Sequence, residues 1–425
     1  MMKYQVNLKW LVVTIVFSCQ TQTAFCQDDF WQASALTNKT VYSLAININD
    51  HIFAGTPGGT IFSSIDNGEN WIEVNNGLST NSSINSLAIN SNGVIFAGSD
   101  EDGIFKSTDN GENWTQINNG LSNTHVRSLI INLNDHIFSG TEGGVFRSID
   151  NGGSWVQIGI VNKWTLSLAI NSSGHIWAGT NAGLSRSTDN GENWSEINVD
   201  LDNPIVWSIA INSNDHIFVG TSNSGIFRSE NNGDSWIVIN AGLTSTDVKT
   251  LDINTIGHIF AGTGAAYQSN GGAFLSTDNG DSWSEVSTGL TNRDVRSIAI
   301  NSNGYVFVGT SSRSYDPGGV FRSVESTVSA KETDNWMSSS FSLEQNYPNP
   351  FNPITTIIYQ LPKATMVNIS IYNIAGQLVE TLVSEYNNAG YHSMIWKASS
   401  ISSGLYFYRI EAGEFSETKK LILQK

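Results

Sequence analysis

The stretch STDNGENW occupies residues 107–114 of this chain and returns unchanged at residues 187–194. The wider pattern Ser-x-Asp-x-Gly-x-x-Trp fits three further segments, and a sixth copy carries Asn in place of Asp. The copies span residues 64–71, 107–114, 148–155, 187–194, 229–236 and 276–283. Such recurrence indicates that one structural unit is repeated along the chain.

Each repeat also contains short apolar segments. One resembles SLAI (residues 43–46) and the next resembles HIFAG (residues 51–55), and both occur seven times in related forms. The Asn-Asp, Asn-Gly or Ser-Gly pairs between them are typical of tight hairpin turns. A third apolar segment precedes the eight-residue motif, and a fourth begins at its Trp. Four short antiparallel strands in about 42 residues are typical of a propeller blade.

The composition agrees with an all-β fold, because 39 Gly in 425 residues suit many tight turns and short strands. We therefore predict a seven-bladed β-propeller over residues 27–323. Residues 324–340 are polar and are predicted to form a linker. Alternating strands over residues 341–425 then predict a small immunoglobulin-like β-sandwich.

The repeats also predict how the ring closes. Trp31 stands where the Trp of the motif would be, but no motif precedes it, and the seventh unit ends near Ser323 without one. The outer strand of the last blade should therefore come from the N-terminus, near residues 30–34. Such pairing would leave no open sheet edge between the first and last blades.

The eight-residue motif predicts a self-locking hairpin turn. Its Asp can accept bonds from backbone N–H groups one to three residues on, its Gly can take a positive φ, and its Trp can cover the turn. We expect a structural role, because Asn231 keeps the turn but cannot serve as an acid or base. The residues concerned are Asp66, Asp109, Asp150, Asp189, Asn231 and Asp278, with Trp71, Trp114, Trp155, Trp194, Trp236 and Trp283.

The motif over residues 64–283 resembles the Asp-box, or BNR repeat, of secreted β-propellers. Sialidases, some other glycoside hydrolases and many non-catalytic propellers carry this repeat. The resemblance implies that the box is a structural turn on the rim away from the active site.

Departures from the repeat indicate where a ligand could bind, because insertions gather on one face of such folds. Two longer loops join second and third strands of neighbouring blades and contain Tyr267, Arg313, Tyr315 and Asp316. A second set stands just before each inner strand, where the residue type varies freely around a channel mouth: Tyr42, Asn85, Arg127, Leu166, Trp207, Lys249 and Arg296. Solvated loops and variable strand ends are the alternative interpretations.

No pattern of a known catalytic motif, cofactor or metal site is present. The acidic turn at residues 100–103 offers too few ligands for a cation, and a solvated turn is favoured. Sequence spacing does not test whether two carboxylates meet across a propeller. A glycoside hydrolase of the sialidase or xyloglucanase type therefore stays the alternative to a non-catalytic protein that binds a glycan or protein partner, and a spacer or adhesin module without a pocket is a third reading.

The first 26 residues are typical of a signal peptide, with Lys3 and Lys9 before an apolar core too short to span a bilayer. A lipoprotein signal modified at Cys19 or Cys26 is the alternative. The net charge of −17 becomes more negative once this segment is removed. Such a surface repels phosphate backbones, so no nucleic-acid partner is expected. No later apolar run predicts a transmembrane segment.

The C-terminal region carries a second set of matching residues. They include NYPNPFNP (residues 346–353), AGYH (residues 389–392), SGLY (residues 403–406) and KKL (residues 419–421). The region resembles the C-terminal sorting domain of the type IX secretion system of Bacteroidota. The resemblance implies interaction with that secretion machinery, and location in the medium or on the cell surface of a Gram-negative bacterium.

Overall fold

The computed structural model describes residues 29–78, 81–197, 205–264, 271–312 and 317–328, and most of residues 341–424. In the last part, residues 344, 347–348, 362–364, 388–389 and 414 are not described. The described residues form β-strands, turns and one 3-10 segment, η1 (Pro57–Gly59), and contain no α-helix. They therefore contain no helix that could cross a membrane.

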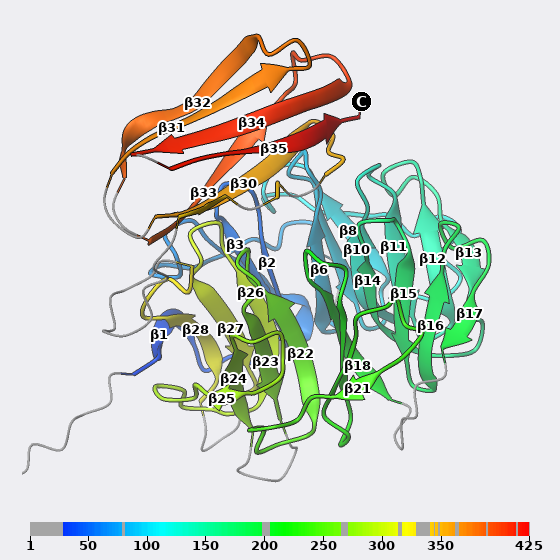
Figure 1. The fold of residues 1–425 in the computed structure, drawn as a ribbon. Helices are drawn as coiled ribbons and strands as arrows, with labels where there is room; N and C mark the ends of the chain where they lie inside the picture. The colour runs from blue at the N-terminus through cyan, green and yellow to red at the C-terminus, as the bar shows by residue number, and fades with distance from the viewer. Residues whose placement is uncertain are drawn as a thin grey trace, which may run out of the picture.

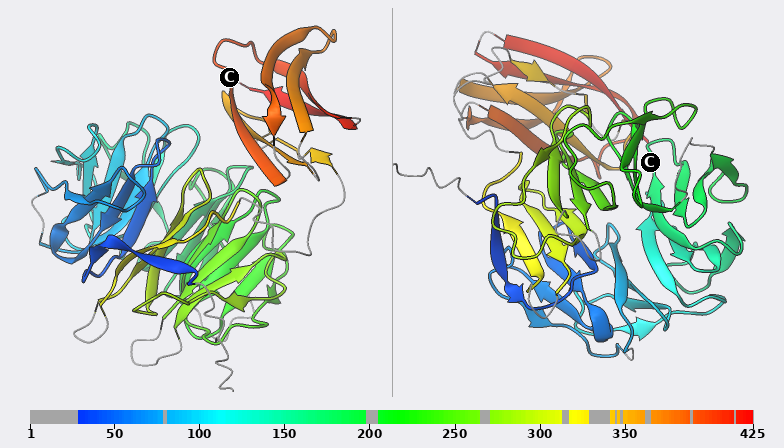
Figure 2. Two further views of the ribbon diagram at one scale, coloured as in Figure 1. Left: turned by 90° about the vertical axis from the view of Figure 1, so that its left-hand side faces the viewer. Right: turned by 90° about the horizontal axis from the view of Figure 1, so that it is seen from below.

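Seven four-stranded antiparallel sheets are arranged around an axis as the blades of a propeller (Figures 1 and 2). The all-β fold predicted from the repeats is confirmed. Blades one to three contain β2 (Ser43–Ile46), β3 (Ile52–Gly55), β4 (Ile61–Ser64) and β5 (Ile72–Glu73); β6 (Ile84–Ile89), β7 (Ile95–Ser99), β8 (Ile104–Ser107) and β9 (Thr115–Gln116); and β10 (Val126–Ile131), β11 (Ile137–Thr141), β12 (Gly144–Ser148) and β13 (Val156–Gly159).

The remaining blades follow the same order. They contain β14 (Thr165–Ile170), β15 (Ile176–Thr180), β16 (Gly183–Ser187) and β17 (Ser195–Ile197); β18 (Val206–Ile211), β19 (Ile217–Thr221), β20 (Ile226–Ser229) and β21 (Ile237–Val238); β22 (Val248–Ile253), β23 (Ile259–Thr263), β24 (Gly272–Ser276) and β25 (Ser284–Glu285); and β26 (Val295–Ile300), β27 (Val306–Thr310), β28 (Gly319–Ser323) and β1 (Trp31–Thr37).

The second strand of every blade is buried along its whole length, as in β7 and β19. Neighbouring blades cover both faces of each sheet, so these strands carry apolar side chains at successive positions. The hairpin before each second strand is fixed by an Asn side chain. In blade one, Asn47 Oδ1 accepts from the N–H groups of Asn49 (2.9 Å) and His51 (3.0 Å), and Asp50 has a φ of 60°. The Asn-Asp and Asn-Gly pairs thus form the predicted turns.

Strand β1 is the outer strand of the seventh blade. It pairs with β28, with Trp31 opposite Ser323 and Ala33 opposite Phe321. The predicted closure of the ring by the N-terminal strand is confirmed. Trp31 is only 1% exposed, and its indole Nε1 donates to the carbonyl of Val286 in the preceding blade.

The first residues of the predicted linker lie on the propeller. Val324 N–H donates to the Phe30 carbonyl (2.9 Å), and Thr327 N–H donates to the Gly304 carbonyl (2.8 Å). The side chain of Val328 packs on Gly304. The segment 324–328 therefore lies against the seventh blade. Its N–H groups donate to backbone carbonyls next to β1 and in the hairpin before β27.

The C-terminal region forms two sheets around one core. One contains β29 (Ser342–Leu343), β30 (Ile354–Leu361) and β33 (Gly390–Lys397), and the other contains β32 (Leu378–Asn387), β31 (Thr365–Asn373), β34 (Gly404–Ala412) and β35 (Phe415–Leu423). Ile357 and Trp396 of the first sheet share a cluster with Ile369 and Tyr408 of the second. Asn346 is buried and donates through Nδ2 to Thr355 Oγ1 (2.8 Å), so the Asn-Pro-rich segment is tied to this core.

Candidate functional site

The propeller has two faces of different chemistry. The turn face carries the six eight-residue motifs and the hairpins between first and second strands. The mouth face is opposite and carries the connections from second to third strands and from blade to blade. The sheet order of the blades fixes this division, since consecutive antiparallel strands turn at alternate ends.

On the turn face the motif locks itself with hydrogen bonds among its own residues. In the copy at residues 107–114, Ser107 Oγ donates to Asp109 Oδ1 (2.8 Å) and accepts from Gly111 N–H (2.8 Å). Asp109 Oδ1 accepts from the N–H of Asn113 (2.9 Å). The carboxylate thus reaches four residues on, and the expectation of one to three is wrong. The reason is that Asn110 and Gly111 both have positive φ, which lengthens the turn.

These bonds also set the ionisation of the motif carboxylates. Bonds from the side chain and backbone of Ser154 and from Ser148 lower the pKa of Asp150 to about 2. The pKa values of Asp66, Asp109, Asp189 and Asp278 are lowered as well, by bonds from the residue four positions on. A general acid needs the opposite shift.

The motif tryptophans bind the preceding blade as well as their own turn. Trp114 Nε1 donates to the Val74 carbonyl (2.7 Å), Trp155 Nε1 to that of Ile117 (2.7 Å) and Trp283 Nε1 to that of Ile239 (2.7 Å). Trp71, Trp194 and Trp236 donate to the Gly carbonyl of their own motif. Trp71 also donates to Ser34 Oγ of the seventh blade (3.2 Å), and Trp194 to the Ile158 carbonyl of the preceding blade (3.1 Å). The expected cover over the turn is therefore only part of the role, since five of these six side chains also donate to a residue of the preceding blade.

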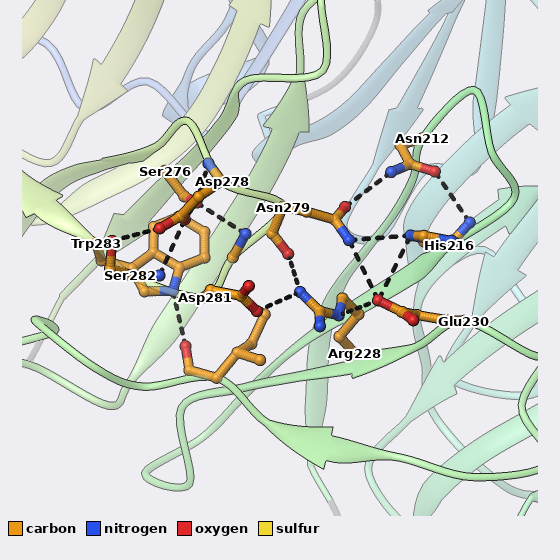
Figure 3. Close-up of polar contacts among 12 residues, drawn as sticks. Asn212, His216, Arg228, Glu230, Ser276, Asp278, Asn279, Asp281, Ser282 and Trp283 are labelled. Atoms are coloured by element: carbon orange, nitrogen blue, oxygen red, sulfur yellow. Dashed lines mark hydrogen bonds and ion pairs between the residues drawn. The ribbon is translucent and has the colours of Figure 1, made fainter.

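A row of five cations joins five of the seven blades to the next one. The residue before the motif Ser donates to the carbonyl of the motif Asn in the following blade, as with Arg147 to Asn190 (2.7 Å) and Lys106 to Asn151 (3.1 Å). Figure 3 shows Arg228, which binds the Asn279 carbonyl (2.5 Å) and Asp281 (2.8 Å). Blade one has Ser63 and blade six has Leu275 at this position, and the blade after blade six has no motif to receive a bond. The turn face is therefore occupied by contacts that hold the ring.

The predicted mouth residues occupy a different setting. Arg127, Trp207, Lys249 and Arg296 lie inside the inner strands, at a shift in register that leaves each of them unpaired with the second strand. Only Tyr42 precedes its strand, as expected. A bulge re-aims a side chain out of the ladder. This explains why the residue type varies here while the neighbouring positions do not.

Arg127 lies between two carboxylates. Its NH2 group is 2.9 Å from Asp100 Oδ1 and 2.5 Å from Glu142 Oε1. The expectation that the acidic turn at residues 100–103 is simply solvated is wrong for Asp100, because Asp100 is ion-paired with Arg127. Asp100 and Glu142, with His125, are also close enough to hold a metal ion. The Arg127 guanidinium lies between the Asp100 and Glu142 carboxylates and pairs with both, so the two do not face each other directly.

The other mouth cations are paired in the same way. Lys249 Nζ lies 2.9 Å from Asp247 Oδ1 and 4.3 Å from the centre of the Trp207 ring. Arg296 NH2 lies 2.8 Å from Asp294 Oδ2. These carboxylates were not predicted, although Asp247 and Asp294 stand at one repeat position, two residues before the cation. No described mouth cation gathers with another to form a three-arginine site.

Tyr267, Arg313, Tyr315 and Asp316 lie outside the described residues. That these two loops bind a ligand therefore stays a prediction.

Two families match parts of the chain. Residues 345–424 match the secretion system C-terminal sorting domain, and residues 75–206 match the DUF6242 beta propeller domain. The chain thus combines a β-propeller with a sorting tail of the type IX kind, which implies export to the cell surface or the medium. None of the curated proteins matches the sequence.

Solved structures share the fold at low identity. PorZ, an essential bacterial surface component of the type-IX secretion system of Porphyromonas gingivalis, matches with a TM-score of 0.56 and 14% identity, over 93% of this chain and 60% of that chain. YCF48 bound to D1 peptide matches with a TM-score of 0.59 and 18% identity, over 70% and 97% of the two chains. A GH74 xyloglucanase from Xanthomonas campestris gives a TM-score of 0.50 and 14% identity, over 66% and 59%. At these identities the likeness establishes the fold alone.

Proposed function

We propose that this chain is a secreted or cell-surface propeller that binds an extracellular glycan or protein partner through its mouth face, without catalysis. The observation that carries the proposal is the contrast between the faces. The turn face repeats the same contacts in blade after blade, whereas the mouth positions are re-aimed by bulges and differ in chemistry. Exposed polar and aromatic side chains on a rigid scaffold favour binding.

The proposed organisation follows the predicted boundaries. Residues 1–26 would be removed as a signal peptide, residues 27–323 would form the binding propeller, and residues 341–425 would be recognised by the type IX secretion machinery. The turn motif would be an Asp-box, since its Ser, Asp, Gly and Trp bind as a turn. Its lowered carboxyl pKa values support a structural role.

We propose the absence of catalysis because the carboxylates at the mouth are paired with cations. Arg127 separates Asp100 from Glu142, and Lys249 and Arg296 each have a carboxylate of their own. The competing function is hydrolysis of a glycan, favoured by the nearness of Asp100 and Glu142 and by the likeness to a xyloglucanase fold.

The test uses the full mature chain on a glycan array and on a peptide library, with a glycosidase assay in parallel. The double variant Lys249→Ala/Arg296→Ala should weaken binding by about tenfold, as expected when interface side chains are truncated. The matched variant Glu112→Ala, an exposed residue of the turn face, should bind as the parent does. Turnover that disappears in Glu142→Gln would instead establish the hydrolase.

A further inference from the structure

The seventh blade lacks the eight-residue motif but keeps its first residue. Ser323 ends the segment GVFRS at residues 319–323, as Ser148 ends the same segment in blade three. Ser148 Oγ donates to Asp150 Oδ1, two residues on (2.7 Å). Ser323 Oγ also donates two residues on, to the backbone carbonyl of Glu325 (2.7 Å). The last blade therefore begins the turn as the others do, and a carbonyl takes the place of the missing carboxylate.

The chain beyond Ser323 also takes over a contact that the motif makes in other blades. The side chain of Asn212, which fixes the inner hairpin of blade five, donates through Nδ2 to Oδ1 of the motif residue Asn279 in the following blade (3.1 Å; Figure 3). The same bond joins blade seven to blade one. Asn254 is the equivalent residue of blade six, and the next blade offers it no motif Asn. Its Nδ2 donates instead to Thr327, to Oγ1 at 3.3 Å and to the carbonyl at 3.4 Å.

The same segment covers the inner hairpin of blade seven. Thr327 donates to the Gly304 carbonyl through its N–H (2.8 Å) and its Oγ1 (2.7 Å). Val328 packs so closely that a β-carbon on Gly304 would lie 2.1 Å from one of its methyl groups. A β-carbon would meet nothing within 4 Å at the equivalent glycines of blades two, four and six, which are Gly93, Gly174 and Gly257. This cover is therefore a feature of the last blade and is not required by the hairpin.

The segment also holds the start of β1. Val324 N–H donates to the Phe30 carbonyl (2.9 Å), one residue beyond the pair formed by Trp31 and Ser323. On the other side, Phe30 N–H donates to Thr288 Oγ1 of blade six (3.0 Å). The beginning of the strand that closes the ring is thus bound between blade six and this segment.

The seam between blades six and seven needs such a contact more than the other seams do. Leu275 stands where five other blades carry the cation that binds the next motif, and no motif follows it. Hydrogen bonds of the segment 323–328 to Phe30, Gly304 and Asn254 are the substitutes at this seam.

We propose that residues 323–328 form a strap that replaces the seventh motif and locks β1 onto the ring. Lifting the strap from the turn face releases β1 and opens the seam between blades six and seven. The chain continues from Val328 toward the C-terminal region, so tension on that region acts first on the strap and through it on β1. The inference goes beyond the proposed function and does not depend on what the mouth face binds.

The experiment measures hydrogen exchange of the full mature chain by mass spectrometry, because the exchange of protected amides reports local opening. Thr327→Val/Val328→Ser removes the hydroxyl bonds to Gly304 and Asn254 and the apolar cover. The amides of β1 should then exchange at least about tenfold faster, since several contacts of this size are lost together. The amides of β14 and β15, on the far side of the ring, should exchange within about twofold of the parent.

A milder variant tests the strap from the ring side. Asn254→Asp keeps the oxygen that accepts from His258 N–H (2.8 Å) and loses the donor to Thr327. It should speed the exchange of β1 by about threefold to tenfold. Asn171→Asp is the matched control, because its oxygen accepts from His175 N–H in the same way (2.9 Å) and blade four has no strap. Exchange of β1 in this control should stay within about twofold of the parent.

Two outcomes would overturn the proposal. In the first, the amides of Val324 and Thr327 lose protection in Thr327→Val/Val328→Ser while those of β1 keep theirs, which would mean that the strap only rests on the ring. In the second, β14 and β15 lose as much protection as β1, which would mean that the variants destabilise the whole propeller and not one seam.

Discussion

The turn face and the mouth face are built on the same repeated backbone, yet they use their side chains in opposite ways. On the turn face a cation such as Arg147 is bound to the following blade and a tryptophan such as Trp114 to the preceding one. On the mouth face, Arg127 and Lys249 leave the ladder at a bulge and meet nearby acids. Repetition therefore marks the contacts that hold the ring, and variation marks the surface free to take a function.

The largest loss of stability is expected on removal of Trp31, whose contacts close the ring. Trp31 is 1% exposed, packs against Val295 and Phe321 and binds the Val286 carbonyl. Trp31→Ala should lower the free energy of unfolding by about 3–5 kcal/mol, the usual cost of removing a buried tryptophan. Denaturant unfolding followed by circular dichroism measures it. Trp114→Ala should cost a similar amount, because the contact is equivalent.

The mouth face supplies the control for this comparison. Trp164→Ala removes a tryptophan that is 47% exposed and should cost less than about 1 kcal/mol. If Trp31→Ala were no more harmful than Trp164→Ala, β1 would not be closing the ring in solution.

The sequence was sufficient to predict the turns and the closure, because both depend on local chemistry and on counting. The Asn-Gly pairs predict positive φ, and the lone Trp31 predicts the missing strand. The sequence did not predict which residues of neighbouring blades bind each other. Whether Trp114 reaches Val74, or Arg127 lies between Asp100 and Glu142, depends on how neighbouring blades rotate against each other. Trp164 was not singled out from the sequence, because the residue type at its repeat position varies from blade to blade, as it does at the predicted mouth positions.

A second prediction concerns Asp252 on the inner strand, between the two faces. Five of its equivalents are Ala, as in Ala210 and Ala299, and burial raises the pKa of Asp252 to about 7. A raised carboxyl pKa means that the folded state holds a proton that the unfolded chain releases near pH 4. The folded state therefore loses stability as the pH rises from about 4 to 7.

Asp252→Ala should relieve this loss. The variant should be more stable than the parent by about 2–4 kcal/mol at pH 8, and nearly equal to it at pH 4. Thermal or urea unfolding at several pH values measures the difference, and Ala299→Gly provides a control with no titratable group. A constant difference between pH 4 and pH 8 would mean that the carboxyl group ionises normally.

The smallest effect is expected for a single motif carboxylate on the turn face. Bonds from Ser154 and Ser148 lower the pKa of Asp150 from about 3.8 to about 2. A lowered carboxyl pKa contributes stability that is present above pH 4 and is lost as the pH falls toward 2. Asp150→Asn should therefore lower the melting temperature slightly at pH 6, and the gap to the parent should close between pH 4 and pH 2. Asn231 already makes the amide version of the contact, with Oδ1 accepting from Ser235 N–H at 2.9 Å. Asn231→Asp should for this reason introduce the acid sensitivity that Asp150→Asn removes. A gap between Asp150→Asn and the parent that stays constant down to pH 2 would show that the ionised carboxylate does not account for the difference.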